Sequence, residues 1–149
     1  AAYKAYKEFK GKNVPLLVIE NPPAEIALST GEGIRDIVKK SRDIFIENAK
    51  EGGMSESQAR HEAEKLIGAT WDVGHINMLR KFGYSEEDIV KETENIAPYL
   101  KHIHLSDNFG FEHTELPMGM GNVPLKEMMK KLGEKGFESK KIIEASAWW

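Results

Sequence analysis

Residues 69–75 read ATWDVGH, a short apolar run that leads to an acidic residue and then to an imidazole. β-Branched and aromatic side chains favour a strand over 69–73, which carries Asp72 near its C-terminal end. His75 begins a short helix that we predict to continue to Phe82. A strand that ends in an ionisable side chain just before a helix is typical of the ligand-binding edge of an α/β sheet.

Three other segments of the same kind occur in the chain, each an apolar run that carries an acid or an imidazole. They are residues 14–20 (VPLLVIE) with Glu20, residues 101–106 (KHIHLS) with His102 and His104, and residues 141–145 (KIIEA) with Glu144. The first is expected to be a buried parallel strand, because its apolar residues are continuous rather than alternating.

Segments with helical periodicity separate these strands. Helices are predicted over 2–10, from a capping box at Ser29 to about Lys50, from Ser55 to about Ile67, from Ser85 to about Pro98, and over 124–135, where Gly136 ends the last; a Gly-rich loop is predicted over 108–123. The alternation predicts one α/β domain over residues 1–149 with about four parallel strands. Right-handed crossovers bring the C-terminal ends of all four strands to one edge of the sheet.

Composition limits the functional classes. A chain of 149 residues with 40% hydrophobic residues and a net charge of −3 is typical of a soluble globular domain, and its acidic balance does not favour nucleic-acid binding. The absence of cysteine excludes a disulfide scaffold, a thiolate metal site and a cysteine nucleophile. No apolar run is long enough to span a membrane, and no signal-peptide pattern is present, so the expected compartment is the cytoplasm.

The predicted sheet edge gathers Glu20, Asp72, His104 and Glu144. Each residue alone has an ordinary explanation: a glutamate can bound a strand in solvent, an aspartate can cap a helix, and a histidine can belong to the core. Three carboxylates that converge without a cation would repel one another and raise their pKa values. A divalent cation removes that conflict. Mostly oxygen ligands with one imidazole favour Mn²⁺, Mg²⁺ or Co²⁺, with Zn²⁺ or Fe²⁺ as alternatives.

Five motifs, in this order and spacing, resemble the xylose-isomerase-like barrel superfamily. They are LLVIENPP with Glu20, WDVGH at 71–75, HIHLSDN at 102–108, PMGMGN at 117–122 and IIEAS at 142–146. The superfamily includes sugar-phosphate isomerases and epimerases, ketose 3-epimerases and apurinic endonucleases of the endonuclease IV type. The resemblance implies that the chain is the C-terminal half of a (β/α) TIM barrel, and it does not name a substrate.

The epimerase branch assigns roles to these residues by resemblance. The residues matching Glu20, Asp72, His104 and Glu144 hold one divalent metal. The two glutamates also form the acid/base pair that moves a proton beside a carbonyl through a metal-stabilised enediolate. If the chain is an active enzyme, the resemblance therefore implies a metal-dependent isomerase or epimerase acting on a sugar or a sugar phosphate.

Further contacts with substrate are expected from His75, Asp107 and Trp71. His75 contacts substrate or a second metal in the resembling family. Trp71 has two interpretations, as a barrel-packing residue or as one wall of a sugar pocket. The run from Gly119 to Asn122 can bind phosphate through backbone N–H groups, but a tight loop is the simpler interpretation.

Two other functions stay open. A half-barrel can keep a metal and lose catalysis, which would make the chain a non-catalytic metal- or sugar-binding module. The endonuclease branch has an additional Asp-x-His pair before the Gly-rich turn. This chain has His113-Thr114-Glu115 there, which departs from that order although it can still supply ligands.

Four strands are half of a closed barrel, and an open parallel sheet leaves two edges exposed. We therefore expect a half-barrel that is completed by association, either with a second copy of the chain or with a complementing half. Such an association would also cover Trp148 and Trp149.

Overall fold

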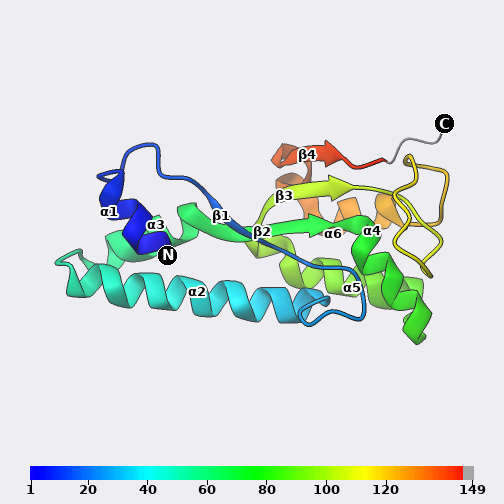
Figure 1. Ribbon diagram of the computed structural model, residues 1–149, viewed down its shortest axis with the longest axis horizontal. Coiled ribbons are helices and arrows are strands. Elements are labelled where there is room, and N and C mark those ends of the chain that lie inside the picture. Colours follow the sequence, from blue (N-terminus) through cyan, green and yellow to red (C-terminus); the bar gives the residue numbers. More distant parts are fainter. Residues whose placement is uncertain (146–149) are drawn as a thin grey trace.

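Four parallel strands, in the order β1-β2-β3-β4, form the sheet of this protein, whose computed structural model describes residues 1–145 (Figure 1). The strands are β1 (Leu17–Glu20), β2 (Ile67–Asp72), β3 (Leu100–Leu105) and β4 (Lys140–Ile143). The predicted α/β class and the predicted parallel sheet are confirmed. The expectation about Trp148 and Trp149 falls outside the described residues.

Helices connect the strands, and the longer ones pack against one face of the sheet. They are α1 (Ala2–Glu8), α2 (Gly31–Glu51), α3 (Glu56–Leu66), α4 (Val73–Asn77), the 3₁₀ helix η1 (Met78–Phe82), α5 (Glu86–Ile96), the 3₁₀ helix η2 (Ala97–Tyr99) and α6 (Leu125–Glu138). Within residues 1–145, no helix combines the length and the apolar character that a membrane crossing requires.

Some boundaries differ from the prediction for local reasons. Thr30, rather than Ser29, caps α2, and its hydroxyl accepts the N–H of Gly33 at 3.1 Å. The short helix predicted from His75 begins at Val73 instead, because Asp72 caps it. Gly136 does not end α6 but lies buried inside it.

The core lies between the sheet and the helices. Trp71 of β2 and Ile103 of β3 are completely buried on this side, together with Phe45 of α2. The indole N–H of Trp71 donates to the hydroxyl of Thr93 in α5 at 3.1 Å, which satisfies the polar edge of a buried aromatic ring. Trp71 therefore holds α5 against β2 and is a packing residue; the expected contact with substrate does not fit its position.

The two outer strands are partly exposed. β1 was predicted to be buried, but Leu17 and Val18 are each 39% exposed, and Ile143 of β4 is 69% exposed. The reason is that each outer strand pairs on one side only among the described residues, whereas β2 and β3 pair on both. The apolar outer strands fit a sheet that continues into further strands, as in a barrel.

Candidate metal centre

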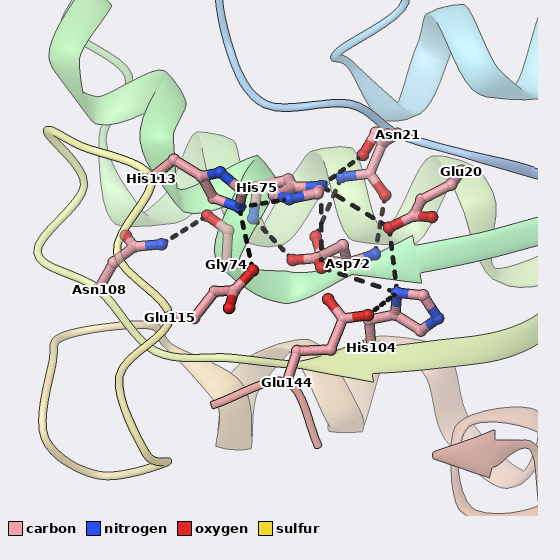
Figure 2. Close-up of polar contacts among 10 residues, drawn as sticks. All are labelled: Glu20, Asn21, Asp72, Gly74, His75, His104, Asn108, His113, Glu115 and Glu144. Carbon is pink, nitrogen blue, oxygen red and sulfur yellow. Dashed lines mark hydrogen bonds and ion pairs between the residues drawn. The ribbon is translucent and has the colours of Figure 1, made fainter. Parts of the chain in front are cut away.

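The strand register places four ionisable side chains on the face of the sheet that the helices leave open. Asp72 of β2 stands opposite His104 of β3, and Glu20 ends β1 beside them. Glu144 directly follows β4, where its N–H donates to the carbonyl of Leu105 at 2.9 Å. One ligand atom from each of the four side chains lies within 4.8 Å of the others (Figure 2). The cluster predicted from the sequence is therefore assembled by the fold.

His104 lies at the middle of this cluster. Its Nδ1 atom is 3.0 Å from Oε1 of Glu20 and 3.0 Å from Oε1 of Glu144. The two glutamates reach it from opposite edges of the sheet, since β1 and β4 are the outer strands. The same nitrogen is 3.9 Å from Oδ2 of Asp72. A nitrogen surrounded by three carboxylates within 4 Å is a favourable arrangement for a shared cation.

Asp72 supplies the most direct test of that idea. Its side chain is completely buried, and its Oδ1 atom accepts the N–H of His75 at 2.8 Å. Its Oδ2 atom is buried and accepts no hydrogen bond, although it faces the cluster. A buried carboxylate oxygen without a donor is costly. A divalent cation would satisfy it, so these four residues fit a metal.

The electrostatics of Asp72 agree with this interpretation. Burial raises the pKa of Asp72 above its ordinary value, and the nearby Glu144 and Glu20 carboxylates raise it further, while His75 acts in the opposite direction. A bound divalent cation would favour the charged form of Asp72 and offset the repulsion between its carboxylate and those of Glu20 and Glu144.

His75 lies beside the cluster and is 8% exposed. Its Nδ1 atom is 2.9 Å from the carbonyl oxygen of Asn21 and 3.8 Å from Oε1 of Glu20. Its Nε2 atom is 2.9 Å from Nε2 of His113, which comes from the Gly-rich loop. The order of residues 113–115 departs from the endonuclease pattern, yet the loop does bring an imidazole to this site.

Asp107 organises the Gly-rich loop instead of joining the cluster. Its Oδ1 accepts the N–H groups of Asn108 at 2.9 Å and Val123 at 3.0 Å, and its Oδ2 accepts the N–H of Gly119 at 2.8 Å. A Cβ atom on Gly121 would lie 2.4 Å from Oδ1, so the loop requires glycine there. The substrate contact expected of Asp107 does not fit, because its carboxylate already binds the loop. The bond between Asp107 and the N–H of Gly119 agrees with the interpretation of this segment as a tight loop.

His102 and Asn21 lie next to the four-residue cluster. His102 shares the open face with His104, at 5.0 Å between ring centroids, but it is not a member of the four-residue cluster. Burial lowers the pKa of His102, and the neighbouring His104 adds to the effect. Asn21 was not predicted from the sequence to be a site residue. Its contacts with Asp72 and His75 depend on tertiary structure, so no local pattern indicated them.

Comparison with known proteins places this architecture in a family. The family model described as xylose isomerase-like TIM barrel matches residues 21–147. The chain belongs to this family. A membership of this kind explains why a parallel sheet carries its ionisable residues at the C-terminal strand ends, which is where TIM barrels build their sites.

Two individual proteins are similar to the chain. An uncharacterized protein of Methanocaldococcus jannaschii is 32% identical over 80 residues, which are 54% of this chain and 26% of that protein. The crystal structure of a D-tagatose 3-epimerase-like protein aligns with a TM-score of 0.49 and 21% identity, over 96% of this chain and 60% of that one. The match therefore spans about a quarter of the first protein and three fifths of the second.

Proposed function

We propose that this chain carries the metal-binding half of a sugar isomerase or epimerase, which transfers a proton at the carbon beside a carbonyl. The observation that supports it is the position of two glutamates, each 3.0 Å from the same His104 nitrogen and each coming from a different edge of the sheet. Membership of the xylose isomerase-like TIM barrel family supports the same class of chemistry.

The four clustered residues, Glu20, Asp72, His104 and Glu144, would hold one divalent cation. When bound, a cation of this kind supplies positive charge to the carbonyl and hydroxyl oxygens of a hydroxy-ketone. Mn²⁺, Mg²⁺ and Co²⁺ suit the oxygen-rich donor set, and Zn²⁺ is the alternative.

The proton transfer itself would belong to the glutamates. Glu20 and Glu144 are partly exposed, at 39% and 31% of their side chains, whereas the Asp72 side chain is fully buried. Of the three carboxylates in the cluster, only the two glutamates can therefore reach a substrate. One would take the proton from the carbon and the other would return a proton to the opposite face, as an acid/base pair does. His75 would bind a substrate hydroxyl from the adjoining side.

A second candidate function is a metal- or sugar-binding module without turnover. The observation that favours it is the openness of the site: Glu20 ends β1 and Glu144 follows β4, and both of these outer strands expose apolar side chains. A pocket that encloses a sugar would need further strands. We propose that a second copy of the chain or a complementing half supplies them, which would also cover β1 and β4.

Solvent exchange distinguishes the candidates. The chain, loaded with Mn²⁺ or Co²⁺, is incubated in D₂O with a panel of ketohexoses and ketose phosphates. We expect deuterium to appear at the carbon beside the carbonyl, detected by NMR, and we expect EDTA to abolish the exchange. Metal uptake with no exchange on any ketose would support the binding module. Nicking of DNA that contains an abasic site would support the endonuclease alternative instead.

A further inference from the structure

Asn21 is completely buried at the end of β1, and its carboxamide contacts Asp72 twice. The side-chain NH₂ donates to the carbonyl of Asp72 at 3.0 Å, and the side-chain oxygen accepts the N–H of Asp72 at 2.8 Å. These are reciprocal bonds to both main-chain groups of a residue that belongs to the metal cluster. Figure 2 shows Asn21 beside His75 and Asp72.

The end of the backbone ladder between β1 and β2 explains why a side chain makes these two bonds. The backbone ladder between β1 and β2 ends at Glu20 and Thr70, and the residues after Asn21 are Pro22 and Pro23, which have no N–H to donate. The main chain of Asp72 lies beyond that last rung and is buried, so its polar groups need partners. The carboxamide of Asn21 replaces the missing rung of the ladder.

The main chain of Asn21 makes a third contact, with His75. The Nδ1 atom of His75 is 2.9 Å from the carbonyl oxygen of Asn21. A carbonyl oxygen only accepts, so Nδ1 must carry the proton. In the neutral ring, Nε2 then carries the lone pair, and this atom points at Nε2 of His113, 2.9 Å away. Asn21 therefore determines which nitrogen of His75 carries the lone pair.

We propose that Asn21 is a positioning residue for the metal centre. It fixes the main chain of Asp72, so that the unpartnered Oδ2 atom faces Glu20, His104 and Glu144, and it holds His75 as the Nδ1–H tautomer. The inference deepens the proposed function and relies on it only for the presence of a metal. Catalysis is not needed for it to hold.

The test compares wild type with Asn21→Ala by calorimetric titration with Mn²⁺. Loss of groups that orient metal ligands typically weakens binding by about 10–100-fold, and we expect a loss in that range. The matched control is Thr93→Val, which removes the buried hydrogen bond to Trp71 on the helix side of the sheet. We expect this control to lower the melting temperature and to leave the Mn²⁺ affinity unchanged.

A measurement on the metal-free wild-type chain needs no variant. In ¹⁵N NMR spectra of the imidazoles, we expect to find the proton of the neutral His75 ring on Nδ1. A proton on Nε2 would overturn the inference. So would a Mn²⁺ affinity of the Asn21→Ala variant that lies within twofold of the wild-type affinity. A wild-type chain that binds none of Mn²⁺, Co²⁺ and Zn²⁺ would also overturn it. Metal binding without ketose turnover, combined with the expected Asn21→Ala loss, would refute the proposed function and leave the role of Asn21 supported.

Discussion

Asp72→Asn is expected to weaken divalent-metal binding by more than about 100-fold, and to leave the metal-free chain at least as stable as wild type at pH 7. The substitution removes a ligand charge but keeps the shape of the side chain. Its remaining oxygen can still accept the N–H of His75, and asparagine is as good a helix cap as aspartate. The substitution weakens metal binding but does not destabilise the metal-free chain, because the buried carboxylate of Asp72 is stabilised only when a cation is bound.

The direction of the stability effect follows from the pKa of Asp72. Burial raises this pKa in the folded chain above its value in the unfolded chain. Between the two values the folded chain binds more protons, so the free energy of unfolding falls as the pH rises. Above the folded pKa the destabilisation is fully present. Replacing the carboxylate by a neutral amide should remove this destabilisation and therefore raise the free energy of unfolding at pH 7.

Urea unfolding of the metal-free proteins at pH 7, together with calorimetric titration with Mn²⁺, measures both effects. Asp88→Asn is the matched control, because hydrogen bonds from Ser85 lower the pKa of Asp88 and thus act in the opposite direction. This control should destabilise the chain at pH 7 and keep its metal affinity. A clear destabilisation by Asp72→Asn, or an unchanged Mn²⁺ affinity, would contradict the role given to Asp72.

Glu144→Gln is expected to lower the rate of proton exchange beside a ketose carbonyl by about 10²–10⁴-fold, the usual contribution of a general acid or base. The amide cannot take a proton from carbon. Its oxygen can still approach a cation, whereas in Asp72→Asn the remaining oxygen is held by the N–H of His75, so the metal affinity should fall less than in Asp72→Asn. Loss of exchange with most of the metal retained separates proton transfer from metal binding.

The same D₂O exchange assay measures this variant. Glu138→Gln, at the end of α6 and outside the cluster, is the control and should keep the wild-type rate. Glu20→Gln should also block the interconversion of epimers, because that reaction needs a proton on each face of the carbon. Full activity of Glu144→Gln would show that this glutamate is not one of the two proton-transfer groups.

The four-residue cluster could be predicted from the sequence because its geometry follows from strand periodicity. Parallel strands connected by helices bring their C-terminal ends together, so Glu20, Asp72, His104 and Glu144 had to meet. The sheet, its strand order along the chain and most helix positions follow from the same patterns. The cap of α2 was misplaced by one residue, since Ser29 and Thr30 are both suitable N-cap residues.

The surroundings of the cluster could not be predicted because they depend on contacts between distant segments. Asp107 was expected to bind substrate, yet its carboxylate folds back on Gly119 and Val123, and nothing local indicates this. Asn21 was missed since its partners are 51 and 54 residues away. The exposure of β1 depends on which strands lie next to it, which an apolar run does not specify.

The position of a bound metal is the most direct test of the proposed centre. Crystals of the chain would be soaked in Mn²⁺, and anomalous diffraction would be recorded at the manganese absorption edge. We expect one strong anomalous peak per chain, surrounded by Glu20, Asp72, His104 and Glu144, with Oδ2 of Asp72 among its ligands. Diffraction data with no peak among these four side chains, or with the metal bound only elsewhere on the chain, would contradict the proposed metal centre.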